Sequence, residues 1–288
     1  MCDGHLSFLR LLPVGLINKN IRINMKIIKS FYLVIPVVFA ALLISCESND
    51  NPTNSVYIPQ PVNKKVLLEY FSNSSCVPCI EMHRSFIEPV EATSGVTIND
   101  TAIVFISWQY KYPNTQDSVY WANPVQNAYR ANYYQVLGAP QGNLDGNFMG
   151  SYSTNDWSSQ VNAEFKKTKF LDVVLTNTYD SISRTGSISA NVQTLVTPGT
   201  SDNVIHFVLT ESDVNYVTAQ NGIKVLNDCM RLMITDTSGV PFTFGGNQTI
   251  TENYSVNSKY NDSNCHLVVF VQSVHSQNVY GVERIAVK

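Results

Sequence analysis

The motif Cys76-Val77-Pro78-Cys79 holds two thiols at a spacing that suits three kinds of site. Such a pair can be a redox-active disulfide, half of a zinc site or a structural staple. In a redox pair the first thiolate attacks a partner and the second thiol resolves the mixed disulfide. The motif alone leaves these three interpretations open.

The surrounding sequence favours the redox interpretation. A staple across so short a loop would stabilise the fold little. A zinc site needs four ligands, the next cysteine after Cys79 is Cys229, far along the chain, and His83 is a single histidine. We therefore expect Cys76 to attack and Cys79 to resolve, with no metal and no cofactor.

The N-terminal region has the features of an export signal. Lys26 and Lys29 precede an apolar run at residues 31–44, which is shorter than the roughly 20 residues that span a bilayer. The run ends in Leu-Ile-Ser-Cys, which resembles the lipobox of bacterial lipoproteins and predicts lipidation of Cys46. An ordinary signal peptide or a short anchor is the alternative. Because the signal is complete from Met25, we expect translation to start there.

These features divide the N-terminal region into two segments. Residues 1–45 are predicted to be a leader and signal peptide, and residues 46–63, which are polar and contain proline, a flexible tether. Export places the thiols in an oxidising compartment. The formal net charge is −3 and no basic run occurs, so we expect no nucleic-acid partner. The lipid on Cys46 would hold the protein in the cell envelope.

Elements of alternating type flank the cysteine pair. Asn123-Pro124 and Ser153 look like helix starts. In the first of these helices one face is predicted to carry Val125, Ala128, Tyr129 and Tyr133. The predicted order is a strand at 64–73, the cysteine pair opening a helix, a strand at 101–108, a helix from 124, a Gly-Ala-Pro turn before a short strand, and a last helix from about 153.

This order, with the cysteine pair opening a helix, resembles a thioredoxin-fold domain, here at residues 64–168. The resemblance implies a cis proline at Pro140 beside the cysteines and a backbone at Ala139 that pairs with an extended substrate. Cys76 would then be exposed at the helix N-terminus, where free N–H groups lower its pKa.

Two positions depart from the thioredoxin pattern. Ser75 stands where thioredoxins usually carry an aromatic residue. The buried acid of their first strand aligns with Tyr70, so that Glu69 is expected to point to the opposite face. The stretch "VLLEYFSNSSCVPC" at residues 66–79 also resembles a narrower group, lipoproteins of Bacteroidota related to a 28 kDa outer membrane protein. That resemblance implies an outer-membrane location.

Residues 169–288 show period-two alternation, as in Ile188, Ala190 and Val192. Six to eight short strands over this stretch predict an immunoglobulin-like sandwich. Cys229 and Cys265 each open a predicted strand, and we expect a structural disulfide between them, with two buried free thiols as the alternative. His206 is expected to be packed or solvated. Cys265 and His266 cannot chelate together, because consecutive strand residues face opposite ways.

The sequence thus predicts an α/β thioredoxin-like domain followed by an all-β immunoglobulin-like sandwich. The predicted function is a membrane-anchored thiol–disulfide oxidoreductase that acts on thiols or disulfides of envelope proteins. The alternative is a non-catalytic surface lipoprotein that uses the thioredoxin fold as a scaffold, since a fold alone does not imply a function.

Overall fold

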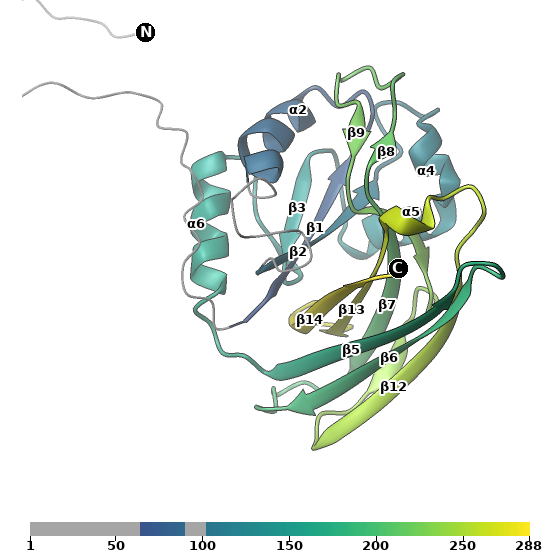
Figure 1. Cartoon of the computed structure of the whole chain (residues 1–288). Helices are drawn as coiled ribbons and strands as arrows, with labels where there is room; N and C mark the ends of the chain where they lie inside the picture. Colours follow the sequence, from purple (N-terminus) through teal and green to yellow (C-terminus); the bar gives the residue numbers. More distant parts are fainter. Residues whose placement is uncertain (1–63, 90–101) are drawn as a thin grey trace, which may run out of the picture. The chain divides into compact units, whose positions relative to one another are not determined.

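The computed structural model describes residues 64–89 and 102–288 (Figure 1). The predicted signal peptide, the lipidation site Cys46 and the tether lie outside the described residues. The described helices and helical turns are α2 (Pro78–Met82), η1 (His83–Ile87), α4 (Ser118–Ala122), α5 (Pro124–Tyr133), α6 (Thr154–Glu164) and η2 (Asp262–Asn264). No helix within 64–89 or 102–288 has the length and apolar character to cross a membrane.

The strands run from one end of the described chain to the other. They are β1 (Val66–Ser72), β2 (Ile103–Gln109), β3 (Gln141–Leu144), β4 (Asn147–Phe148), β5 (Leu171–Asp180), β6 (Thr185–Thr194), β7 (Asn203–Glu211), β8 (Val214–Asn215), β9 (Val225–Leu226), β10 (Cys229–Met233), β11 (Val240–Phe242), β12 (Asn247–Ser255), β13 (Cys265–Ser273) and β14 (Val279–Ala286).

One mixed sheet joins the two halves of the sequence. Its order is β14-β13-β7-β10-β2-β1-β3-β4, with β11 added to β7. β1 and β2 are parallel, and β10 continues the sheet in parallel beside β2, with Cys229 opposite Ser107. Both β1 and β2 are buried along their whole length, as expected for parallel strands covered on both faces.

Two apolar clusters cover the opposite faces of β1 and β2. On one face Leu68 and Phe105 pack with Met82 of α2, Phe86 of η1 and Trp157 of α6. On the other face, residues of β1 and β2 form a single cluster with residues of α5 and of the C-terminal strands. The main members of that second cluster are Leu67, Phe71, Ile106, Trp108, Ala131, Tyr134, Val208, Met230, Val268 and Phe270.

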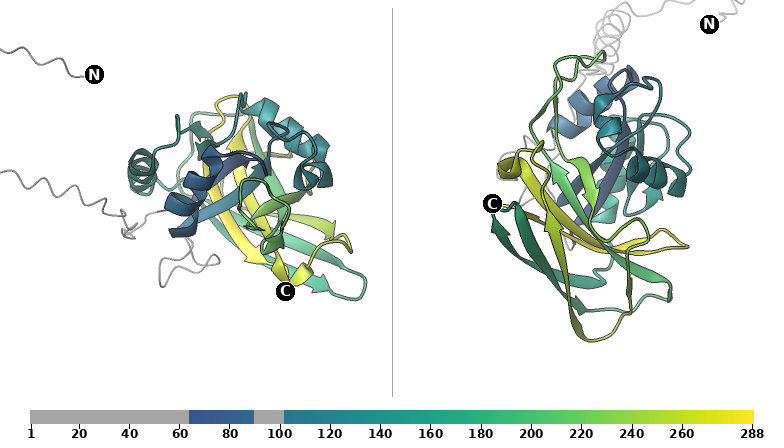
Figure 2. Two further views of the ribbon diagram at one scale, coloured as in Figure 1. Left: turned by 90° about the horizontal axis from the view of Figure 1, so that it is seen from above. Right: turned by 90° about the vertical axis from the view of Figure 1, so that its right-hand side faces the viewer.

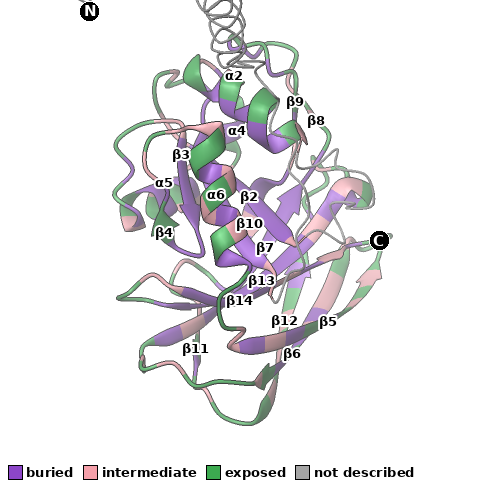
Figure 3. Cartoon of the chain, turned by 90° about the vertical axis from the view of Figure 1, so that its left-hand side faces the viewer, coloured by how far each residue is buried: buried purple, intermediate pink, exposed green. Residues whose placement is uncertain are grey.

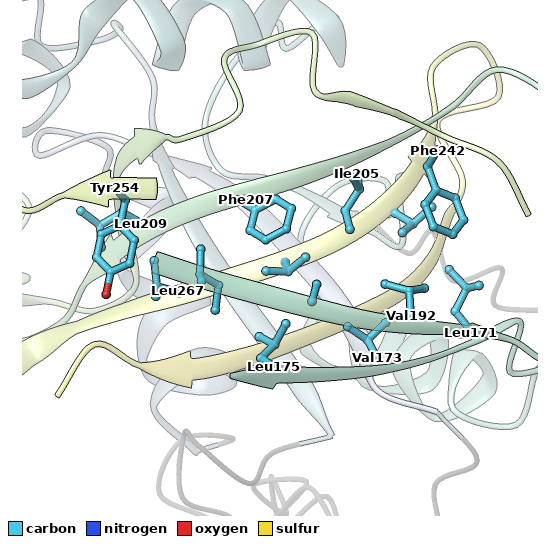
Figure 4. Packing of buried hydrophobic residues seen from close by; sticks show 14 of the residues in the cluster. Leu171, Val173, Leu175, Val192, Ile205, Phe207, Leu209, Phe242, Tyr254 and Leu267 are labelled. Atoms are coloured by element: carbon cyan, nitrogen blue, oxygen red, sulfur yellow. The ribbon is translucent and has the colours of Figure 1, made fainter. Parts of the chain in front are cut away.

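A second, three-stranded sheet in the order β12-β6-β5 packs against β7, β13 and β14. Figure 4 shows the side chains of Leu175, Val192 and Phe207 meeting between the layers. The inward residues of β5 and β6 alternate with exposed ones, because successive strand residues face opposite sides. Figure 1 and the right-hand view in Figure 2 place most of the helices at one end of this unit and β5, β6 and β12 at the other.

The predicted order of elements in the first half is confirmed, including the caps. The Asn123 side chain accepts the Gln126 N–H at the start of α5, and Ser153 accepts the Asp156 N–H at the start of α6. The predicted face of α5 is wrong, because Val125 and Tyr129 are exposed and Ala128 and Tyr133 are only partly buried. The buried face instead carries Asn127, Arg130 and Ala131, together with Tyr134 just after the helix.

The second half is β-rich, as predicted, but the immunoglobulin-like sandwich is not confirmed. β7, β10, β13 and β14 extend the sheet of the first half instead of forming a sheet of their own. The boundary between residues 168 and 169 stays a prediction. The alternating patterns that predicted these strands do not specify which neighbour each strand pairs with. The pairing of β10 with β2, for example, involves one register position and leaves no pattern in the sequence.

Candidate functional site

The cysteine pair lies where β1 ends and α2 begins. Cys76 and Cys79 form a disulfide, with their Cα atoms 5.3 Å apart. Pro78 occupies the first turn of α2, where its missing N–H is not needed. The Cys79 N–H lies 3.2 Å from Cys76 Sγ and donates to it. In the reduced state this N–H would stabilise a Cys76 thiolate.

Both cysteines are buried, which corrects the prediction of an exposed Cys76. Cys76 is 2% exposed and Cys79 is 0% exposed, whereas Val77 between them is 69% exposed. Figure 3 shows green, exposed segments of α2 above the purple strands of the sheet. The physical reason is that Cys76 follows a loop, residues 73–75, that other parts of the chain enclose.

Asn73 is the centre of that loop. Its side-chain amide donates to the carbonyl oxygens of Tyr110 (2.8 Å) and Asn114 (3.1 Å). Its Oδ1 accepts the N–H groups of Ser75 and Asn114. A single side chain therefore connects the segment before Cys76 to the segment after β2.

Asp117 provides a second anchor for the same loop. Its carboxylate accepts the Ser74 N–H at 2.7 Å and the N–H groups of Val119 and Tyr120, so it also caps α4. Asp117 is fully buried. Asn73 and Asp117 were not predicted to belong to the site, although their residue types suit loop anchors and helix caps.

The predicted opposite orientation of Glu69 and Tyr70 is confirmed. Tyr70 faces the cysteine helix, and its ring makes an edge contact with His83, with ring centroids 6.4 Å apart. His83 is buried one turn after Cys79, and its N–H donates to the Cys79 carbonyl. Burial lowers the pKa of His83, and Glu88, 3.8 Å from its Nδ1, opposes that shift in part.

Glu69 lies on the other face, in a buried ionic network. Arg130 donates to both of its carboxylate oxygens at 2.7 Å, the Trp108 indole donates at 2.9 Å and the Tyr134 hydroxyl at 2.5 Å. Gln272 of β13 accepts from Arg130 at 2.8 Å. No local pattern indicates a role for Arg130, because its partner Glu69 is 61 positions away. The network joins the two halves of the chain but does not reach the disulfide face.

Ala139-Pro140 is brought to the end of β1 from which the cysteine loop departs. The peptide bond between them is cis, as predicted. The next residue, Gln141, pairs with Phe71 at the end of β1, and both Ala139 and Pro140 are partly exposed. The structure thus keeps this turn at the same end of the sheet as the cysteine motif.

A hairpin formed by β8 and β9 lies on the other side of the cysteine loop and was not predicted from the sequence. Asn221 in its connecting segment donates its backbone N–H to the Ser74 carbonyl at 2.8 Å. The Asn221 side chain donates to the Asn73 carbonyl at 3.0 Å. The strands of this hairpin are two residues each, too short to leave an alternating pattern.

The predicted disulfide between Cys229 and Cys265 is wrong, and both residues are buried free thiols. Cys229 on β10 and Cys265 on β13 each lie opposite Glu211 of β7, which separates them. Two strand spacings put their Cα atoms about 10 Å apart, beyond the roughly 7 Å that a disulfide spans. Burial raises the pKa of both thiols to about 12.

The other candidate residues and the groove described below lie outside the site around the disulfide. His206 is packed against Phe270. Within the described ranges no cluster of three or more His, Cys, Asp or Glu side chains could hold a metal ion. An open groove of about 750 Å³ lies on the three-stranded sheet, away from the cysteine motif. Its lining is Thr178, Tyr179, Asp180, Thr185, Gly186, Ser187, Leu232, Ile234, Asn253, Tyr254 and Ser255.

The sequence matches no protein-family model and no curated protein. Among solved structures, HBP35 of Porphyromonas gingivalis is similar with a TM-score of 0.66 and 12% identity, over 79% of this chain and 76% of that chain. A domain of the outer membrane lipoprotein Omp28 from Porphyromonas gingivalis matches with a TM-score of 0.32 and 14% identity, over 42% of this chain and 91% of that chain. The first similarity shows that this chain shares the mixed, sheet-rich fold of HBP35.

Proposed function

We propose that this protein is a thiol–disulfide oxidoreductase of the cell envelope that acts on protein thiols or disulfides. The observation that carries the proposal is the Cys76–Cys79 disulfide at the start of α2, with the Cys79 N–H donating to Cys76 Sγ. That N–H would stabilise the thiolate that forms at Cys76 and so favour it as nucleophile and leaving group.

The proposed exchange has two steps. With the pair reduced, the Cys76 thiolate attacks one sulfur of a partner disulfide, a bond forms between them, and the partner's other sulfur leaves as a thiolate that takes a proton. Cys79 then loses its proton and attacks Cys76 Sγ, which releases the second partner thiolate and forms the Cys76–Cys79 disulfide. The reverse sequence oxidises a partner. Ala139-Pro140 would position the partner's extended chain.

Substitution of the resolving cysteine tests this proposal. Cys79→Ser should stall the exchange at the mixed disulfide, so adducts with envelope proteins should accumulate on non-reducing gels and disappear with reductant. Cys76→Ser is the matched control and should abolish the adducts, because Cys79 is fully buried. If the Cys79→Ser variant traps no protein in its native envelope, the oxidoreductase proposal is wrong.

The burial of the disulfide favours a second candidate, a non-catalytic envelope protein that uses the fold as a scaffold. A pair in which Cys76 is 2% exposed and Cys79 0% exposed is poorly placed for collision with a free thiol. The same trapping experiment separates the two candidates, because a structural disulfide forms no adducts.

We also propose that Cys46 carries a lipid that anchors the protein to the envelope, at the outer membrane. The support is the basic and apolar run that ends at Cys46. Cys46→Ala should leave an unprocessed or mislocalised precursor, which metabolic labelling with a fatty acid and cell fractionation would detect. Normal processing and membrane recovery of Cys46→Ala would contradict the anchor.

A further inference from the structure

The hairpin of β8 and β9, with its connecting segment 216–224, belongs to the second half of the sequence but lies beside the cysteine loop (Figure 1). Its strands pair through Val214 with Leu226 and Asn215 with Val225. Ile223 and Leu226 pack with Val119 of α4 and with Cys229. The base of the hairpin is therefore anchored in an apolar cluster, independently of the cysteine motif.

The connecting segment bonds to all three residues that precede Cys76. The Asn221 N–H donates to the Ser74 carbonyl at 2.8 Å, and the Asn221 side-chain amide donates to the Asn73 carbonyl at 3.0 Å. Ser75 Oγ donates to Gln220 Oε1. The Asn221 Oδ1 accepts the Ile223 N–H at 3.0 Å, so one buried side chain holds both the turn and the cysteine loop.

This arrangement places the cysteine loop between two chain segments, the Ala139-Pro140 turn and the β8–β9 hairpin. In the sheet β1 lies between β2 and β3. The Ala139-Pro140 turn leads into β3, on one side of β1. The hairpin lies on the side of β2, because its chain continues into β10, which pairs with β2. Cys76 between them is 2% exposed. A reactant must therefore displace part of the surrounding chain, and the three bonds around Asn221 and Gln220 oppose displacement of the hairpin.

We propose that Asn221 is a specificity-determining residue, which holds the hairpin against the cysteine loop so that polypeptide partners react and small thiols react slowly. A polypeptide that binds along the Ala139-Pro140 turn gains contacts that offset the free energy of opening the hairpin. A small thiol gains no such contacts and depends on spontaneous opening. This inference rests on the proposed function, because it names the substrate class of the same disulfide.

The rate of reduction by dithiothreitol measures directly how easily a small thiol reaches the Cys76–Cys79 disulfide. One dithiothreitol thiolate attacks Cys76 Sγ, the Cys76–Cys79 bond breaks, and the Cys79 thiolate leaves and takes a proton. The second dithiothreitol thiol, once deprotonated, closes the reagent's ring and releases the Cys76 thiolate. The rate follows from quenching with acid, alkylating and counting the new thiols by intact mass.

Asn221→Ala should accelerate this reduction roughly ten-fold, because the two hydrogen bonds of its side chain are lost. Asn215→Ala, an exposed side chain on β8 of the same hairpin, is the matched control and should leave the rate unchanged. Gln220→Ala removes only the bond to Ser75 and should give a smaller acceleration of about two-fold. This second variant provides the test if Asn221→Ala does not fold.

The rate with a polypeptide thiol completes the test. With reduced, unfolded ribonuclease A at a concentration that saturates the rate, Asn221→Ala and wild type should react within about two-fold of each other, since the bound polypeptide already holds the hairpin open. Equal dithiothreitol rates in Asn221→Ala, Gln220→Ala and wild type would overturn the inference, as would an equal acceleration with both probes. These rates do not depend on whether Cys79→Ser traps partners in cells, so the hairpin inference and the proposed function fail separately.

Discussion

Arg130 and Glu69 illustrate at the scale of residues how much depends on one buried charge pair. Both side chains are essentially inaccessible to water, and the carboxylate has Arg130, Trp108 and Tyr134 as donors. An ion pair in such a place need not stabilise the fold relative to apolar residues, but removal of one partner leaves an uncompensated charge. The network therefore works as a unit.

Arg130→Met should accordingly lower the free energy of unfolding by about 3–5 kcal/mol, as measured by urea denaturation. The double variant Arg130→Met with Glu69→Gln should be less destabilised than Arg130→Met alone, since no buried charge then remains. Lys169→Met, which breaks the half-exposed pair with Asp172, is the control and should change stability by less than about 1 kcal/mol. If Arg130→Met and Lys169→Met lowered the free energy of unfolding by similar amounts, this account would be contradicted.

His206 makes stability depend on pH. Burial lowers its pKa to about 3, and the positive charge of Arg130 adds to the effect. Between about pH 6.5 and pH 3 the unfolded state binds a proton that the folded state does not, so stability falls as the pH falls through that window. Asp145 acts in the opposite direction between about pH 6 and pH 4, because burial raises its pKa to about 6 and the folded state takes up the extra proton.

His206→Leu should therefore reduce the slope of the free energy of unfolding against pH. Between pH 6.5 and pH 4.5 the reduction should be about 1 kcal/mol per pH unit, whatever the variant does to stability at pH 7. Urea denaturation at several pH values measures it, with His275→Gln at the exposed β13–β14 turn as the control. An unchanged slope in His206→Leu would show that the folded state protonates His206 as readily as the unfolded state does.

At the scale of elements, the turn between β13 and β14 docks onto the end of β3. Gly146 has φ of +85°, and a Cβ atom there would lie 1.7 Å from the Gln277 carbonyl oxygen. Val279 N–H donates to the Asp145 carbonyl at 3.0 Å. The close backbone contact is possible only because residue 146 has no side chain.

Gly146→Ala should therefore destabilise the protein by at least about 2 kcal/mol more than Gly150→Ala. Gly150 has a similar φ of +78° and nothing within 4 Å of its Cβ position, so it reports the backbone strain alone, about 1–2 kcal/mol. Thermal or urea unfolding of both variants gives the difference. Equal losses would mean that the turn moves away from residue 146 without penalty.

The elements that the sequence predicted are those whose signal is local. The starts of α5 and α6 are predicted from the capping side chains of Asn123 and Ser153. The position of the site is predicted from the spacing of the two cysteines. The pairing of β10 with β2 and the burial of Cys76 depend on residues far apart in sequence. The β8–β9 hairpin was missed because its two-residue strands carry no periodicity, and the pairing of Cys229 with Cys265 failed because nothing local to either cysteine indicates that β7 separates them.

At the scale of the whole molecule, the sheet makes the two halves of the described chain interdependent. β10 pairs with β2, and Val208, Met230 and Phe270 pack against the same face as Ile106 and the α5 residues. A domain boundary at residue 168 would cut through this shared apolar cluster. We therefore expect both halves to unfold together.

Urea unfolding should thus give one transition, with the same midpoint from tryptophan fluorescence and from far-ultraviolet circular dichroism. All three tryptophans, Trp108, Trp121 and Trp157, lie in the first half, whereas the circular dichroism is dominated by strands of both halves. Separate midpoints, with fluorescence changing before or after the far-ultraviolet signal, would show two independent domains.

The central claim is that Cys76 and Cys79 form a working redox pair, and their redox state in living cells tests it most directly. Cells are quenched with acid before, during and after short pulses of diamide and of dithiothreitol, and the free thiols are alkylated and located by mass spectrometry. The account predicts that the pair changes redox state during a pulse and recovers afterwards, while Cys229 and Cys265 stay thiols throughout. A Cys76–Cys79 disulfide that remains fully oxidised through both pulses, in the wild type and also in Asn221→Ala, where dithiothreitol has easier access, would contradict the claim and identify the pair as a structural link.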